Sequence, residues 1–84
     1  MRNKDIILRA VQYIESNLKE EISVLDIADS IHYSLYHFIR LFQSVTGFSP
    51  GMYLQQRRLS EAVKELKNTG KKIIEIAYDY QFNS

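Results

Sequence analysis

An internal repeat with a period of 49 residues constrains the fold of this chain more than any other feature. Residues 73–84, IIEIAYDYQFNS, are similar to residues 24–35, VLDIADSIHYSL. The repeat aligns several pairs of similar residues: Ile76 with Ile27, Ala77 with Ala28, Glu75 with Asp26, Phe82 with Tyr33, and Asn83 with Ser34. The first copy is followed by a further segment, YHFIRLFQSV, and nothing follows the second copy. The pattern therefore predicts one structural unit that is used twice, with the second copy cut short.

The spacing of apolar residues is helical along the whole chain, which contains one proline and little strand-like alternation. Ser23 and Asp26 form the two halves of a capping box, and Ser34 and Ser49 are further candidate N-caps. The pattern predicts five helices, over about residues 5–18, 24–31, 35–45, 50–68 and 73–79. We therefore expect an all-α fold in a single domain of residues 1–84.

Residues 24–45 fit a helix-turn-helix unit, in which two short helices cross at a steep angle. Ala28 is small enough for a close crossing, and a short turn at residues 32–33 joins the two segments. The residues that would fill the angle are Ile27, Ile31, Phe38 and Leu41. With the preceding segment, this unit predicts a homeodomain-like three-helix arrangement, followed by a linker helix at residues 50–68 and a partial second unit at residues 73–84. The second helix of such a unit enters the major groove of DNA.

The net charge of the chain is +1, but its charges are unevenly distributed. Residues 33–72 carry seven basic and two acidic side chains, a net charge of +5, whereas the segments on either side carry −2 each. A basic stretch of this kind is typical of a surface that faces a polyanion such as DNA, because phosphate contacts supply most non-specific affinity. The alternative is a solvated helix face, which charge runs on helices commonly form.

Composition argues against several other classes of protein. The chain has no cysteine for disulfides or thiolate metal sites, and no apolar run long enough to span a membrane or to form a signal peptide. His32 and His37 lack a third metal ligand in pattern, and there is no glycine-rich phosphate loop and no nucleophile beside a base. We therefore predict a cytoplasmic protein that is not an enzyme and that carries no metal or other cofactor.

The helix order and three motifs, FSP at residues 48–50, YLQQRRL at residues 53–59 and IIEIA at residues 73–77, carry a resemblance to a known family. The chain resembles the DNA-binding domain of AraC/XylS-family transcriptional regulators, in particular the Rob and MarA type. The resemblance implies a domain of seven helices with two helix-turn-helix units that read adjacent segments of double-stranded DNA, here cut after the fifth helix. It also implies transcription regulation as the function and RNA polymerase as a candidate partner.

The same resemblance assigns DNA contacts to the segment of residues 35–45. Where the Rob and MarA group commonly has Trp, Gln and Arg facing the bases, this chain has Tyr36, Ile39 and Arg40. An arginine can donate to O6 and N7 of guanine, whereas tyrosine and isoleucine can contact thymine methyl groups. The predicted DNA-binding residues are Ser34, Tyr36, His37, Ile39, Arg40, Gln43, Lys71 and Lys72.

The resemblance also bears on three positions outside that segment. His32 stands at a turn position where the family has glycine, so we expect a left-handed backbone there. Lys72 replaces the N-cap serine of the first copy, which predicts a weaker helix start. Arg57 is expected to form an interhelical ion pair rather than a phosphate contact.

The sequence also supports a second function. Its last segment carries a dense apolar set: Ile73, Ile74, Ile76, Ala77, Tyr78, Tyr80 and Phe82. If no further helix covers this set, its burial against a second copy would form a homodimer through residues 73–84. On this alternative the chain is a truncated protein-interaction module without specific DNA binding.

Overall fold

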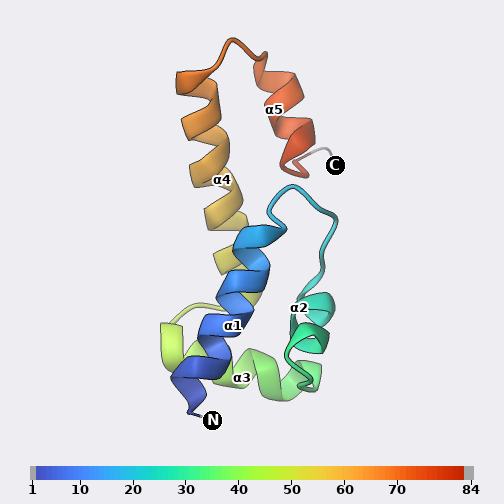
Figure 1. Ribbon diagram of the computed structural model, residues 1–84, viewed down its shortest axis with the longest axis vertical. Coiled ribbons are helices and arrows are strands. Elements are labelled where there is room, and N and C mark those ends of the chain that lie inside the picture. Colours follow the sequence, from blue (N-terminus) through green and yellow to red (C-terminus); the bar gives the residue numbers. More distant parts are fainter. Residues whose placement is uncertain (1, 83–84) are drawn as a thin grey trace.

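The computed structural model describes residues 2–82, which form five helices and no strand (Figure 1). The helices are α1 (Asn3–Ser16), α2 (Val24–Ser30), α3 (Leu35–Thr46), α4 (Pro50–Asn68) and α5 (Ile73–Asp79). The predicted all-α fold and the order of its helices are confirmed. Asn83 and Ser84, which end the predicted second unit, lie outside the described residues.

The first helix lies two residues earlier than the apolar spacing predicted. Asn17 leaves the helical conformation, with a φ of −131°, and its side-chain amide donates to the carbonyl oxygen of Tyr13 at 2.8 Å. This bond stabilises the end of α1 at Ser16. Leu18 is nevertheless buried, and its spacing of four residues from Ile14 had suggested a longer helix.

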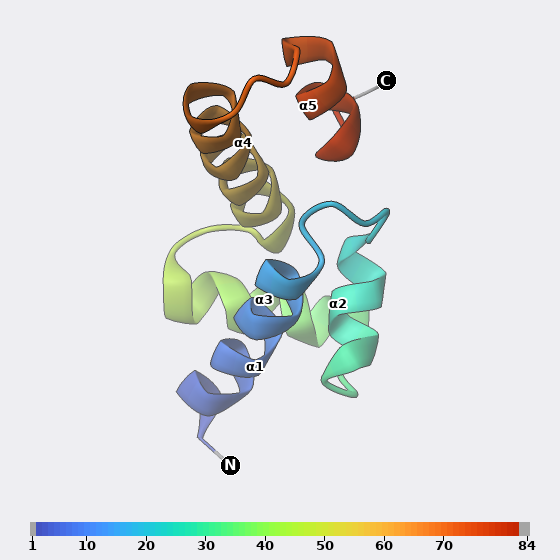
Figure 2. The same cartoon turned by 45° about the horizontal axis from the view of Figure 1, so that its top comes forward.

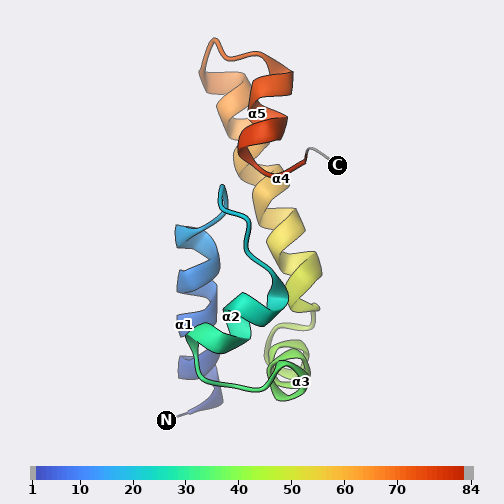
Figure 3. The same cartoon turned by 90° about the vertical axis from the view of Figure 1, so that its right-hand side faces the viewer.

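The first three helices form a cluster around two phenylalanines of α3. Phe38 and Phe42 are fully buried, and their rings meet edge to face with centroids 5.6 Å apart. The same core contains Ile7, Ala10 and Ile14 of α1 and Ile27 and Ala28 of α2. α1 crosses in front of α3 in Figure 2, and Figure 3 shows α1 and α2 on the same side of α3. The packing leaves the opposite face of α3 in solvent.

α4 is the longest helix and connects the two ends of an elongated molecule that measures 43 × 21 × 18 Å (Figure 3). In its first turns Leu54 is buried, and the Tyr53 ring lies 5.6 Å from the ring of Phe42 in α3. Its last turns pack against α5, where Ala62 and Ile76 are buried. α3 therefore lies at one end of the molecule and α5 lies towards the other (Figures 1 and 3).

The backbone of the second copy of the repeat follows that of the first. α2 and α5 have seven residues each and begin 49 positions apart. After each helix the same backbone hydrogen bond closes the turn: Tyr33 N–H to Ala28 O at 3.0 Å, and Phe82 N–H to Ala77 O at 2.8 Å. His32 and Gln81, at matching positions, both have a left-handed backbone, with φ values of 60° and 67°. The repeat and the left-handed turn at His32 are thereby confirmed.

The helix starts of the two copies differ in their capping. In the first copy, the Ser23 side chain accepts from the N–H of Asp26 at 3.1 Å, and the Asp26 carboxylate accepts from the N–H of Ser23 at 2.8 Å. Lys72, in the matching position of the second copy, makes no side-chain cap hydrogen bond. α5 therefore begins without the stabilisation that the capping box gives to α2.

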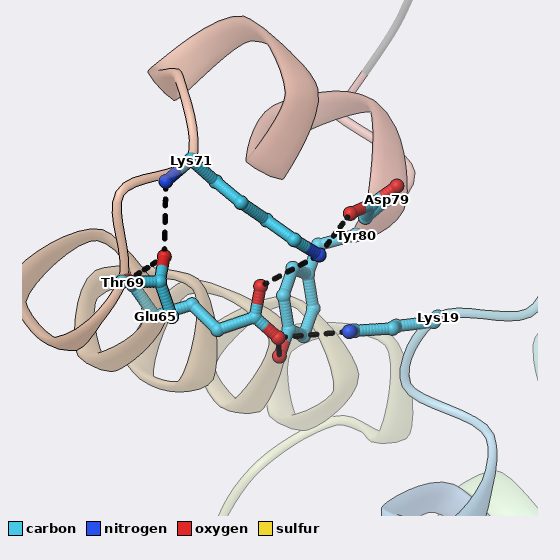
Figure 4. A network of polar contacts seen from close by, with 6 residues as sticks. All are labelled: Lys19, Glu65, Thr69, Lys71, Asp79 and Tyr80. Carbon is cyan, nitrogen blue, oxygen red and sulfur yellow. Dashed lines mark hydrogen bonds and ion pairs between the residues drawn. The ribbon is translucent and has the colours of Figure 1, made fainter.

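A polar network centred on Glu65 of α4 joins α5 to the loop after α1 (Figure 4). Lys19 Nζ lies 2.8 Å from Glu65 Oε1, and the Tyr80 hydroxyl donates to the same oxygen at 3.1 Å. Lys71 Nζ bridges two carboxylates, 3.8 Å from Glu65 and 3.4 Å from Asp79. The hydrogen bond from Lys19 is the main reason why the pKa of Glu65 lies below its ordinary value.

Candidate nucleic-acid interface

α3 buries one face and exposes the other. Its start is set by Ser34, whose hydroxyl oxygen accepts from the N–H of His37 at 3.3 Å. With Phe38 and Phe42 in the core, the opposite positions face solvent. Ile39 is half-buried, and the exposed side chains are Ser34, Leu35, Tyr36, His37, Arg40, Gln43, Ser44 and Val45. Six of the eight predicted DNA-binding residues therefore lie at this one helix.

Arg40 lies between two shallow hollows of this surface. One hollow is lined, besides Arg40, by Tyr36, Ile39, Gln43 and Ser44, and the other by Asn3, Tyr33, His37, Leu41 and Ser44. No acidic residue occurs between residues 30 and 60. Arg40 also makes no ion pair within residues 2–82, and its side chain is exposed. Such a surface is suited to an anionic ligand.

Asn3 is a residue of this surface that the sequence did not indicate. It is the first residue of α1, more than thirty positions before Arg40, and it shares a hollow with Arg40. Only the packing of α1 against α3 brings the two together. No local sequence pattern signals this proximity.

The two predicted lysines lie away from α3. Lys71 and Lys72 belong to the turn between α4 and α5, at the end of the molecule opposite to α3 (Figure 1). Lys71 is engaged with the carboxylates of Glu65 and Asp79, whereas Lys72 is exposed. The structure therefore groups the predicted residues into a cluster at α3 and a separate lysine pair.

Arg57 fastens α4 to α1. Its Nε and Nη2 atoms donate to the two oxygens of Glu15 at 2.8 and 2.9 Å, and Nη2 also donates to Glu61 at 3.1 Å. These carboxylates, Glu15 foremost, raise the pKa of Arg57 above its ordinary value. The predicted interhelical ion pair is confirmed, and Arg57 takes no part in the α3 surface.

Arg58 is a structural residue that sequence reasoning missed. It is 5% exposed, and its Nε and Nη2 atoms donate to the backbone oxygens of Leu18 at 2.9 Å and Glu20 at 2.7 Å. Burial lowers its pKa from the ordinary arginine value. The available signal was its spacing of four residues from both Leu54 and Ala62, which are buried on the same stripe of α4.

Two kinds of site are not found in the part of the chain that the structure describes. No three His, Cys, Asp or Glu side chains lie close enough together to hold a metal ion among these residues. No described helix is both long and apolar enough to cross a membrane.

A short helix, a left-handed turn and a second helix whose exposed face carries Arg40 define a helix-turn-helix domain. Residues 27–84 match a family described as a helix-turn-helix domain. A crystal structure of a transcriptional regulator with an AraC-type DNA-binding domain, from Chromobacterium violaceum, superimposes with a TM-score of 0.86 and 31% sequence identity. The match covers 92% of this chain and 69% of that one. The chain belongs to the AraC-type helix-turn-helix family.

Curated relatives of this family are similar over almost the whole chain. The transcriptional activator AarP of Providencia stuartii is 40% identical over 79 residues, which are 94% of this chain and 58% of AarP. The multiple antibiotic resistance protein MarA of Salmonella typhimurium is 33% identical over 85 residues, covering 99% of this chain and 67% of MarA. The chain thus spans little more than half the length of AarP. The predicted relation to this family is confirmed.

Proposed function

We propose that this chain is the sequence-specific DNA-binding domain of a transcriptional regulator, without a catalytic role, and that α3 enters the major groove of double-stranded DNA. The observation that carries the proposal is the outward face of α3, where Arg40 faces solvent with no acidic residue nearby in sequence. The major groove, about 12 Å wide, admits one α-helix. Two relatives support the proposal: AarP is named as a transcriptional activator, and the solved relative is described as a transcriptional regulator with an AraC-type DNA-binding domain.

Five residues of the α3 face have roles in this proposal that follow from their chemistry. Arg40 donates to O6 and N7 of a guanine, and Ile39 contacts a thymine methyl group. Gln43, one turn after Ile39, has the donor and acceptor that an adenine edge requires. Ser34 and His37 lie at the start of α3, where a phosphate oxygen meets the positive end of the helix.

The proposal includes a further phosphate contact by Lys72 at the opposite end of the molecule. The long dimension of 43 Å is comparable with one turn of B-DNA, about 34–36 Å. A duplex that meets α3 and runs along the long axis of the molecule would pass near the turn before α5. Lys72 is exposed there, whereas Lys71 already pairs with carboxylates and contributes less.

A cytoplasmic location and contact with RNA polymerase complete the proposal. The location follows from promoter regulation, because bacterial promoters and their polymerase share the cytoplasm, and the contact with polymerase is a separate part of the proposal. The activator among the relatives supports this view. Purified polymerase added to the domain on a bound duplex should retard the complex further in a gel, and an unchanged mobility would contradict the contact.

Fluorescence anisotropy with random duplex DNA at increasing salt tests the proposal directly. We expect binding at low salt and a steep fall in affinity as salt rises, because each phosphate contact releases counterions. Selection from randomised duplexes should then yield a preferred sequence. The absence of binding at the lowest salt would refute the proposal.

Arg40→Ala tests whether α3 reads bases. On the selected duplex it should weaken binding by about 1–3 kcal/mol and relax the preference at one base pair. Lys64→Ala removes the same charge from the exposed surface of α4 and should have little effect. Equal weakening on every sequence would reassign Arg40 to a phosphate, and no weakening would remove it from the interface.

A second candidate function, pairing of two copies, is favoured by an apolar groove between α4 and α5. The groove has a volume of about 230 Å³ and is lined by Leu59, Ala62, Val63, Leu66, Ile73, Ile76, Ala77 and Phe82. Ile76 and Tyr80 are buried, but Ile73 is 68% exposed and Phe82 39%. Sedimentation over a wide concentration range tests this candidate. A monomer at all concentrations would exclude it.

A further inference from the structure

Tyr36 and Arg40 form a pair one helical turn apart on the outward face of α3. Arg40 Nη1 donates to the hydroxyl oxygen of Tyr36 at 2.7 Å, and the guanidinium carbon lies 5.5 Å from the centre of the Tyr36 ring. Tyr36 is 64% exposed, so its side chain adds little to the core. Its hydroxyl and ring therefore affect the conformation of the Arg40 side chain more than the stability of the fold.

The Tyr36 hydroxyl accepts a hydrogen bond from one nitrogen of the Arg40 guanidinium and leaves one edge of the guanidinium without this partner. The edge formed by Nε and Nη2 carries two parallel N–H groups. Arg57 uses this edge to bind both oxygens of Glu15. In Arg40 the bond to Tyr36 uses Nη1, so the edge of Nε and Nη2 stays available for two acceptors in one plane, such as O6 and N7 of guanine.

A hydroxyl group restrains this arginine without neutralising it. A nearby carboxylate would hold Arg40 as Glu15 and Glu61 hold Arg57, and would compete with DNA for the cation. With no Asp or Glu between residues 30 and 60, the neutral acceptor on Tyr36 restrains the guanidinium instead. The charge of Arg40 therefore stays available to an anionic ligand.

We infer that Tyr36 is a positioning residue, which orders Arg40 so that its open edge meets a guanine; this inference rests on the DNA binding proposed above. An unrestrained arginine samples many rotamers, and ordering it at an interface reduces affinity. Tyr36 supplies part of that order before binding. Its contribution to base recognition therefore passes through Arg40.

A double-mutant cycle on a duplex selected by the wild-type chain tests the inference. Tyr36→Phe keeps the ring and removes the hydroxyl, and we expect it to lower affinity about three- to tenfold. In an Arg40→Ala background the same substitution should change affinity less than about twofold, because no guanidinium is left to position. Replacing the target guanine by 7-deazaguanine, which lacks the N7 acceptor, should weaken the wild type more than Tyr36→Phe.

Two outcomes of the cycle overturn the inference. An equal loss in both backgrounds would mean that Tyr36 contacts DNA itself, and no loss in the wild-type background would mean that it has no role. Tyr78→Phe is the matched control, because it removes the hydroxyl of an exposed tyrosine on α5. It should leave binding unchanged.

The order of Arg40 can also be measured without DNA. Nitrogen-15 relaxation at Arg40 Nε should show a more ordered guanidinium in the wild type than in Tyr36→Phe, while Arg57 Nε, held by Glu15, stays unchanged. Equal order of Arg40 in both proteins overturns the inference whether or not the chain binds DNA. A well-ordered Arg40 in a wild type that binds no duplex would refute the proposed function alone.

Discussion

Replacing Arg58 by methionine should destabilise the domain far more than a surface substitution. Arg58 joins α4 to the loop after α1 through two hydrogen bonds, to Leu18 O at 2.9 Å and to Glu20 O at 2.7 Å. A hydrogen bond from a charged donor contributes about 1.5–3 kcal/mol. Methionine fills a similar volume but leaves both carbonyl oxygens without this donor, and part of the loss is offset because no charge is buried. We expect a net loss of about 3 kcal/mol in the free energy of unfolding.

Circular dichroism during thermal and urea unfolding measures this loss. In a domain of this size about 3 kcal/mol corresponds to a fall in Tm of about 12–24 °C. Arg57→Met on the same helix is the matched control, since it breaks a partly exposed ion pair with Glu15 and should cost about 1 kcal/mol or less. If Arg58→Met costs no more than Arg57→Met, the two bonds to the loop do not dominate the stability of this junction.

Three further substitutions test individual features of the fold by urea unfolding. The lowered pKa of Glu65 means that its network stabilises the domain above the ordinary glutamate pKa, and that this stabilisation is lost as the pH falls through the lowered value. Glu65→Gln should flatten this acid dependence, and an unchanged acid slope would refute the role of the network. His32→Gly should raise stability by about 0.5–1 kcal/mol by relieving the left-handed backbone, and a loss would show that the histidine side chain stabilises the turn. Lys72→Ser should add about 0.5–1 kcal/mol by giving α5 an N-cap, unless the serine hydroxyl fails to reach the N–H groups of the first turn.

The helices were predictable because their boundaries depend on local chemistry. Ser23, Ser34 and Ser49 each cap the helix that follows, and each acts within three residues of itself. The outward face of α3 followed in the same way from the helical period that buries Phe38 and Phe42. The shifted end of α1 was missed because the Asn17 side chain overrides the apolar pattern that continues to Leu18.

The contacts that hold the helices together were less accessible from sequence. Arg58 donates to the backbone oxygen of Leu18, 40 positions away in sequence. Gln81 donates to the backbone oxygen of Lys19, 62 positions away. Backbone oxygens are present at every residue, so no side-chain pattern marks the ones that accept such bonds. The bond between Tyr36 and Arg40 joins residues four apart on one helix, a spacing that permits the contact but does not specify it.

α4 contributes to the packing at both ends of the molecule, but the two ends bury different numbers of apolar side chains. They should therefore differ in how readily they unfold locally. Around α3 the core includes two fully buried phenylalanines, whereas Ile76 is the only buried residue within α5. Local unfolding requires least free energy where few apolar side chains are buried. We therefore expect the amide protons of α5 to exchange with solvent earlier than those of α3. On this expectation α5 separates from α4 and packs against it again while the first three helices remain folded. α5 then behaves as a separate unit of local unfolding.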